Sequence, residues 1–124
     1  MANKTILAID DDLMLLELIK RMLSDIYQVE TVNSAANALN FMNNNPVDIV
    51  LLDIEMPNIN GFQFLSDIRE IPSYMTVPII IVSGNSGADF HEQAKKSSAF
   101  DVLGKPVNKE VLLQTIEKAI NLSV

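Results

Sequence analysis

The stretch Val47 to Gly61, which reads V-D-I-V-L-L-D-I-E-M-P-N-I-N-G, constrains the fold more than any other part of the chain. Its residues 49–52 form an uninterrupted apolar run, which is typical of a strand covered on both faces, as in a parallel sheet. Asp53 stands where this run stops, and a segment rich in turn residues follows it. Ligands of open α/β sheets bind at the carboxyl ends of the strands. Asp53 is therefore a candidate site residue, with capping of the next turn as the alternative.

Length, charge and cysteine content exclude several classes of protein. The chain has 124 residues, and we expect them to form one domain spanning residues 1–124. It has no cysteine, which excludes disulfide and thiol chemistry, and its net charge of −7 opposes tight binding to nucleic-acid phosphates. No apolar run approaches the length of a membrane span, and Met1 to Lys4 lacks the apolar region of a signal peptide. We therefore expect a cytoplasmic protein without direct nucleic-acid or membrane contact.

Strand and helix patterns alternate along the chain. Apolar or β-branched runs predict strands at residues 5–9, 29–32, 49–52, 77–82 and 100–103. Apolar residues at helical spacing predict helices at residues 13–26, 35–42, 62–68, 88–97 and 107–122, with Ser34 and Asn108 as candidate caps. This alternation predicts an α/β fold, a doubly wound (βα)5 flavodoxin-like parallel sheet with strand order 2-1-3-4-5.

Polar residues end four of the five predicted strands. Asp10 and Asp11 follow the first, Asp53 the third, Ser83 the fourth and Lys105 the fifth. Because parallel strands place their carboxyl ends on one edge of the sheet, we expect these side chains to lie together. Taken singly, Lys105 has a simpler interpretation as a surface lysine and Ser83 as a turn residue. The joint arrangement favours a site.

The expected cluster of carboxylates indicates the chemistry of that site. Like charges held close together disfavour joint ionisation, and a hard divalent cation such as Mg²⁺, which prefers carboxylate oxygens, offsets their repulsion. Lys105 and Ser83 add a positive donor and a hydroxyl donor. Together they predict a receptor for a phosphoryl group carried by one of the acids.

Four motifs in order give the chain a resemblance to a known family: I-D-D-D at Ile9 to Asp12, L-L-D-I-E-M-P-N-I-N-G at Leu51 to Gly61, I-I-I-V-S at Ile79 to Ser83 and G-K-P at Gly104 to Pro106. Over essentially its whole length the chain resembles the receiver domain of two-component response regulators. The resemblance implies a phosphorylatable switch that catalyses only its own phosphorylation and dephosphorylation. It also implies a sensor histidine kinase or histidine phosphotransfer protein as phosphoryl donor, and a downstream protein effector.

The resemblance also implies a role for each matching residue. Asp53 would be the phosphoacceptor, and the Ser83 hydroxyl and Lys105 would bind the phosphoryl group. The expected magnesium ligands are the side chains of Asp10, Asp11 and Asp53 and the backbone carbonyl of Glu55. Lys105-Pro106 matches a position where the family usually has a cis peptide, and Asp12 is expected to cap a helix.

Two residues depart from the family pattern, and the sequence also leaves two other function classes open. Val102 stands where the family usually has an aromatic switch residue, and Ser98 where it commonly has glycine.

Asp10 and Asp12 have the spacing of the nucleophile and general acid in aspartate-nucleophile phosphatases, although no segment is long enough for a substrate-selecting cap. A pseudo-receiver that only binds partners is the other alternative, and the intact set of acids, Ser83 and Lys105 argues against it.

Overall fold

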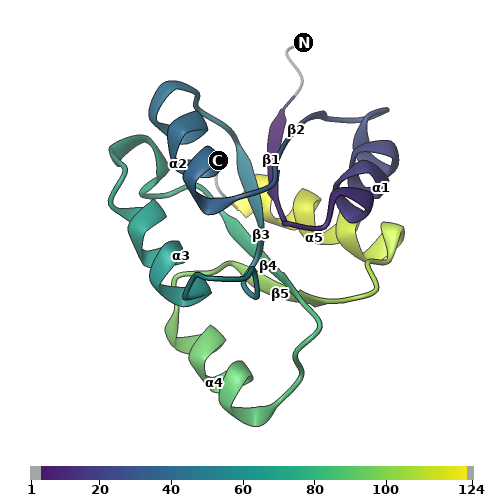
Figure 1. Cartoon of the computed structure of the whole chain (residues 1–124). Helices are drawn as coiled ribbons and strands as arrows, with labels where there is room; N and C mark the ends of the chain where they lie inside the picture. The colour runs from purple at the N-terminus through teal and green to yellow at the C-terminus, as the bar shows by residue number, and fades with distance from the viewer. Residues whose placement is uncertain (1–3, 123–124) are drawn as a thin grey trace.

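One five-stranded parallel sheet with strand order β2-β1-β3-β4-β5 forms the centre of the protein, whose computed structural model describes residues 4–122 (Figure 1). The strands are β1 (Thr5–Ile9), β2 (Gln28–Val32), β3 (Ile49–Asp53), β4 (Ile79–Ser83) and β5 (Asp101–Gly104). Every residue of β3 and β4 is buried, as the uninterrupted apolar runs predict. The predicted fold class and strand order are confirmed.

Five α-helices connect the strands: α1 (Leu13–Leu23), α2 (Ala35–Asn44), α3 (Gly61–Arg69), α4 (Ala88–Lys96) and α5 (Lys109–Leu122). Three predicted caps are confirmed. The Asp12 carboxylate accepts hydrogen bonds from the backbone N–H groups of Met14 and Leu15 at the start of α1. Ser34 caps α2 and Asn108 caps α5 in the same way, through the N–H three residues further along.

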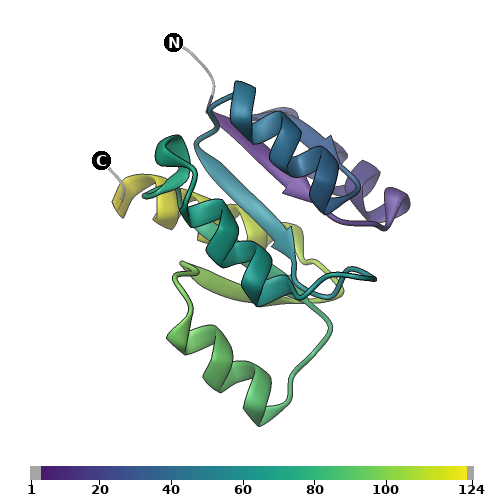
Figure 2. The ribbon, with the colours of Figure 1, turned by 60° about the vertical axis from the view of Figure 1, so that its left-hand side comes forward.

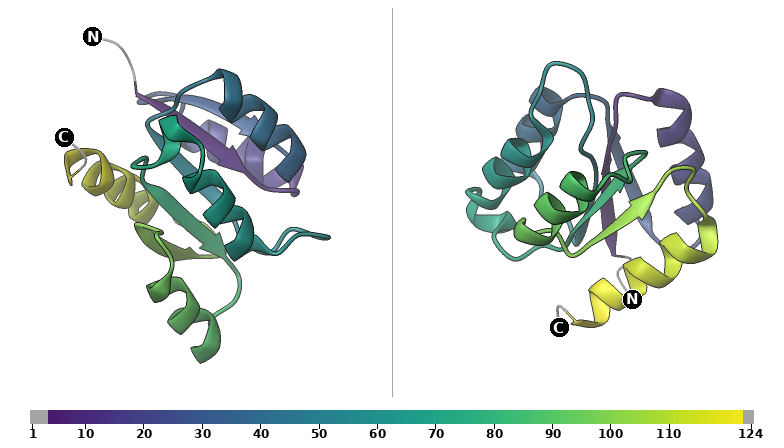
Figure 3. Two further views of the ribbon diagram at one scale, coloured as in Figure 1. Left: turned by 90° about the vertical axis from the view of Figure 1, so that its left-hand side faces the viewer. Right: turned by 90° about the horizontal axis from the view of Figure 1, so that it is seen from below.

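The helices cover both faces of the sheet, and α1 and α5 lie on the opposite face from α2, α3 and α4 (Figures 1 to 3). Alternate residues of each strand pack on opposite faces, as the period of two requires. Leu7 and Leu52, for example, belong to the apolar cluster under α2, α3 and α4. Ile6 and Leu51 belong to the cluster under α1 and α5.

Some predicted boundaries are wrong by a few residues. The helical pattern predicted to reach Ile26 ends at Leu23, because the backbone turns there and the N–H groups of Ile26 and Tyr27 both bond the Leu23 carbonyl. Ile26 is consequently exposed. A short 3-10 helix, η1 (Pro72–Tyr74), lies between α3 and β4, where the sequence pattern indicated only a break.

The loop between β3 and α3 is held close to the end of β3 at Gly61. A Cβ atom added at Gly61 would lie 2.0 Å from the backbone oxygen of Ile54, so no other residue fits without moving the chain. Within the same loop Asn58 has a positive φ of 66°, a conformation that asparagine tolerates better than most residues. The turn residues that follow Asp53 therefore fix the path of the chain beside it.

Among the residues described, no helix has the length and apolar character needed to cross a membrane.

Candidate functional site

The polar strand ends meet at one edge of the sheet, as predicted. Ile9 pairs with Leu52, which brings Asp10 beside Asp53, and Asp53 itself pairs with Val82. Ser83 is the last residue of β4 and pairs with Gly104, the residue before Lys105. Asp53 on β3 lies between β1, which leads into Asp10 and Asp11, and β4, which ends at Ser83, so it occupies the middle of the group.

Three carboxylates form the acidic cluster, which we define as Asp10, Asp11 and Asp53. Each offers one oxygen atom, and these atoms lie within 4.8 Å of one another. Asp10 and Asp53 are each 3% exposed, whereas Asp11 is exposed. Oxygen donors in this number match the preference of Mg²⁺ and other hard cations. The donor set of this cluster therefore fits a magnesium ion.

The two buried carboxylates are held in the same way. Asp10 Oδ1 accepts a hydrogen bond from the Asp12 N–H, and Asp53 Oδ1 accepts one from the Glu55 N–H, both at 2.9 Å. In each acid this hydrogen bond leaves the Oδ2 atom free. Both Oδ2 atoms face the ammonium group of Lys105.

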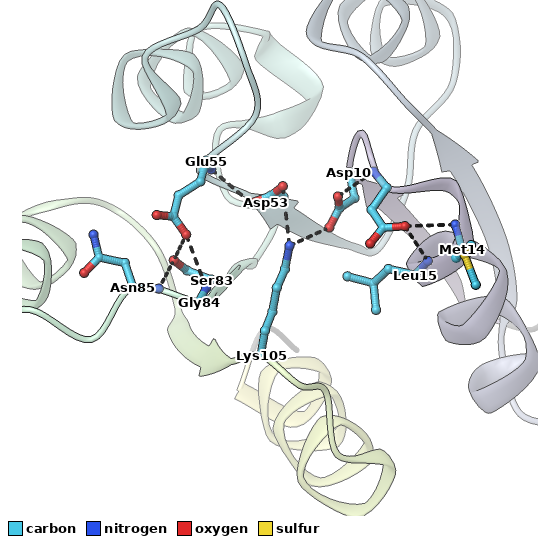
Figure 4. Close-up of polar contacts among 10 residues, drawn as sticks. Asp10, Met14, Leu15, Asp53, Glu55, Ser83, Gly84, Asn85 and Lys105 are labelled. Atoms are coloured by element: carbon cyan, nitrogen blue, oxygen red, sulfur yellow. Dashed lines mark hydrogen bonds and ion pairs between the residues drawn. The ribbon is translucent and has the colours of Figure 1, made fainter.

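Lys105 joins the two buried acids from the end of β5. Its Nζ lies 3.2 Å from Asp10 Oδ2 and 3.6 Å from Asp53 Oδ2 (Figure 4). Partial burial acts to lower the pKa of Lys105, but the carboxylates of Asp53 and Asp10 outweigh it and raise the pKa above its usual value. The lysine therefore remains a fixed positive charge at this position. The peptide bond that follows it, to Pro106, is cis, as the resemblance implies.

Asp53 is the acid whose ionisation is perturbed most clearly. Burial raises its pKa from 3.8 to about 6, and the nearby Asp10 carboxylate acts in the same direction. The hydrogen bond from the Glu55 N–H and the charge of Lys105 act in the opposite direction and offset only part of the rise. Two buried acids facing one ammonium group leave negative charge uncompensated, which is the condition under which a cation binds.

Ser83 lies at the expected edge, but its hydroxyl is turned to Glu55. Ser83 Oγ donates a 2.6 Å hydrogen bond to Glu55 Oε1, which also accepts one from the Gly84 N–H at 3.2 Å. In turn Ser83 Oγ accepts a hydrogen bond from the Asn85 N–H at 3.0 Å. Figure 4 shows the Glu55 side chain directed to Ser83 and Gly84, on the other side of Asp53 from Asp10.

Two side-chain roles were not predicted from the sequence. One is the side chain of Glu55, for which only a backbone role was expected; its position two residues after Asp53, at the same edge as Ser83, was the available signal. The other is Arg69, which binds the loop carrying Ser98. Val102, which stands where the family usually has an aromatic switch residue, is half-buried and packs against the apolar cluster under α2, α3 and α4.

Comparison with known proteins agrees with this geometry. Residues 6–117 match the model of the response regulator receiver domain family. The sensor histidine kinase RcsC of Salmonella typhimurium is 35% identical over 112 residues, which are 90% of this chain and 12% of that protein. The transcriptional regulatory protein GlrR of Escherichia coli is 34% identical over 119 residues, 95% of this chain and 26% of that protein. The chain thus spans only a small part of these relatives.

Solved structures resemble the chain over nearly its full length. A CheY-like receiver domain protein from Methanospirillum hungatei has a TM-score of 0.90 and 26% identity, covering 98% of this chain and 97% of its own. Chemotaxis protein CheY4 of Vibrio cholerae has a TM-score of 0.89 and 28% identity, covering 95% and 99%. The chain therefore belongs to the response regulator receiver domain family of two-component systems.

Proposed function

We propose that Asp53 accepts a phosphoryl group from a phosphohistidine of a sensor histidine kinase or histidine phosphotransfer protein. The observation that carries this proposal is the position of Asp53 between the acids that follow β1 and the hydroxyl that ends β4, with Lys105 within 3.6 Å of its Oδ2. An acceptor on β3 can be reached by charged and hydroxyl groups from both sides. β4 also has site residues on both sides, but it ends in the neutral hydroxyl of Ser83 and carries no carboxylate there.

In the proposed reaction a carboxylate oxygen of Asp53 attacks phosphorus, and the P–N bond of the phosphohistidine breaks. The imidazole leaves with its electron pair and takes up a proton, and Asp53 becomes an acyl phosphate. Lys105 supplies a positive charge where the phosphoryl oxygens arrive, and Asp10 holds that lysine through its own Oδ2. Phosphoryl transfer depends chiefly on such positioning and charge neutralisation. Loss of the group to water returns the free carboxylate.

The acidic cluster and the backbone carbonyl of Glu55 are the proposed ligands for Mg²⁺. When bound, the ion neutralises the charge of the carboxylates and of the incoming phosphoryl oxygens. Asp10 and Asp53 are held for this role by their Oδ1 hydrogen bonds, and Asp11 completes the set from the exposed side. The all-oxygen donor set supports Mg²⁺ over softer metals.

A phosphatase acting on other molecules is the less favoured reaction. That class places a general acid two residues after its nucleophile, following the first strand, and Asp10 and Asp12 have this spacing there. The Asp12 carboxylate is engaged as the cap of α1, which argues against such a role.

We therefore propose that residues 1–124 act as one receiver domain, in the cytoplasm, that turns over only its own phosphoryl group. Its phosphorylation state is read by a protein effector.

Incubation with acetyl phosphate and Mg²⁺, followed by intact-mass spectrometry, tests the reaction without knowledge of the kinase. We expect one added phosphoryl group on the unsubstituted protein and none on Asp53→Asn or in excess chelator. Asp25→Asn, at an exposed acid outside the site, is the matched control and should be labelled normally. Undiminished labelling of Asp53→Asn would contradict the assignment. Phenyl phosphate in the same assay should not be consumed.

A further inference from the structure

The side chain of Glu55 has no part in the proposed chemistry, yet it makes two hydrogen bonds at the site. Its Oε1 accepts one from the Ser83 hydroxyl, at 2.6 Å, and one from the Gly84 N–H, at 3.2 Å. The backbone N–H of the same residue binds Asp53 Oδ1. Glu55 therefore touches the proposed acceptor with its backbone and the proposed phosphoryl-binding hydroxyl with its side chain.

We infer that the Glu55 carboxylate is a latch that holds Ser83 and the start of the β4–α4 loop in the unphosphorylated arrangement and competes with the phosphoryl group for the Ser83 hydroxyl. This inference rests on the proposed function of Asp53. Glu55 is a positioning residue in it: the side chain acts on phosphorylation through Ser83.

The competition follows from the hydrogen-bonding capacity of serine. A hydroxyl has one proton to donate, and that of Ser83 is directed to Glu55. The Asn85 N–H occupies one acceptor position of the same oxygen, so the hydroxyl is fixed from both sides. For Ser83 to donate to a phosphoryl oxygen on Asp53, its bond to Glu55 must break. Each phosphorylation therefore has to displace this contact.

The strength of the latch is set by its surroundings. A hydrogen bond to a carboxylate is stronger than one between neutral groups. Ser83 is only 1% exposed, so its hydroxyl needs a partner, whereas Glu55 is exposed and water can replace its bonds in part. From these two effects we expect removal of the carboxylate to favour the phosphoryl-bound state about fivefold to tenfold.

The first test uses the protein without magnesium or any phosphoryl group, so its outcome does not depend on the proposed function. In Glu55→Ala the backbone amide resonance of Gly84 should move upfield and its hydrogen exchange should become faster. Glu55→Gln keeps an oxygen acceptor without the charge, and it should give an intermediate change. Glu70→Ala, at an exposed glutamate at the end of α3, is the matched control and should leave the Gly84 resonance in place.

The second test measures binding of beryllium fluoride with Mg²⁺, a probe that imitates a phosphoryl group on a carboxylate. Glu55→Ala should raise the apparent affinity about fivefold to tenfold when Ser83 is present. In the Ser83→Ala background the same substitution should give a clearly smaller gain, which reports only the loss of a nearby negative charge. The difference between the two backgrounds measures the competition for the hydroxyl.

Equal gains in the two backgrounds, or a Gly84 resonance unaffected by Glu55→Ala, would overturn the latch. If the unsubstituted protein itself bound no probe while Gly84 responded as expected, the proposed function of Asp53 would fail instead. Asp53→Asn, which should bind no probe, verifies that the measured binding occurs at the intended carboxylate.

Discussion

The guanidinium of Arg69 and the backbone and side chain of Ser98 share two hydrogen bonds, from Nε to the hydroxyl and from Nη2 to the carbonyl, each 2.9 Å long. Nη1 of the same guanidinium donates to the carbonyls of Tyr74, at 2.9 Å, and Val77, at 2.5 Å. Burial lowers the pKa of Arg69. One side chain thus ties the end of α3 to the connection before β4 and to the loop before β5.

Arg69→Met should lower the free energy of unfolding by about 2 to 4 kcal/mol, because the part-buried carbonyls of Tyr74 and Val77 and the exposed carbonyl of Ser98 would lose their donor. Ser98→Ala keeps the carbonyl bond and loses only the hydroxyl, so about 0.5 to 1 kcal/mol is expected. Urea denaturation followed by circular dichroism measures both. Ser66→Ala, at an exposed serine of α3, is the control and should change stability little. An Arg69→Met protein as stable as that control would contradict the role given to the guanidinium.

The sheet and the acidic edge were predictable because they depend on local pattern and topology. Apolar runs that end at Asp10, Asp53 and Ser83 are visible in the sequence, and a parallel sheet brings their ends together. The caps of α1, α2 and α5 were predictable for a similar reason, since a cap acts within three residues of its own position.

The contacts made by long side chains were not predictable. Arg69 and Ser98 are 29 positions apart in the chain, and so are Tyr74 and Asn45, whose carbonyl accepts a 2.6 Å hydrogen bond from the tyrosine hydroxyl. Such pairs depend on where two loops end in space. The local spacing of apolar residues in the sequence does not determine this. The hydrogen bond from Ser83 to Glu55 is of the same kind, because the family pattern implies a hydroxyl that moves to bond the phosphate and names no partner for it before phosphorylation.

Gly61→Ala should destabilise the protein by at least about 2 kcal/mol, because the new methyl group would overlap the Ile54 carbonyl and force the loop after β3 to move. Gly104→Ala is the matched control, since an added Cβ there meets nothing within 4 Å. Thermal and urea denaturation of the two variants should therefore differ in midpoint. Equal midpoints would mean that the loop after β3 accommodates a side chain at Gly61 despite the close contact with Ile54.

The raised pKa of Asp53 predicts a pH dependence of stability in the absence of metal. Its folded-state pKa is about 6 against an ordinary value of 3.8, so the folded protein favours the protonated acid. The stabilising contribution of this group is complete below the unfolded value and is lost as the pH rises through about 6. At neutral pH the ionised acid therefore destabilises the fold.

Asp53→Asn removes that ionisation while keeping a similar shape. We expect the variant to be more stable than the unsubstituted protein at neutral pH by roughly 1 to 2 kcal/mol in chelator, with the difference shrinking as the pH falls through about 5. Urea denaturation across this pH range measures the difference. Asp25→Asn should show no such trend. Parallel stability curves for Asp53→Asn and the unsubstituted protein would show that Asp53 ionises normally in the folded state.

Asp11 separates metal binding from stability, because it belongs to the acidic cluster but is exposed and is held by no hydrogen bond or ion pair among the described residues. Asp11→Ala should therefore leave the melting temperature in chelator nearly unchanged.

Mg²⁺ binds the folded site, so it should stabilise the unsubstituted protein by about 2.7 kcal/mol at a hundredfold excess over the dissociation constant. The variant should gain much less at the same concentration, because one of three carboxylates is gone. Thermal melts of both proteins over a magnesium series, with Asp25→Ala as control, measure this difference. Equal magnesium-induced shifts in Asp11→Ala and the control would place Asp11 outside the metal site.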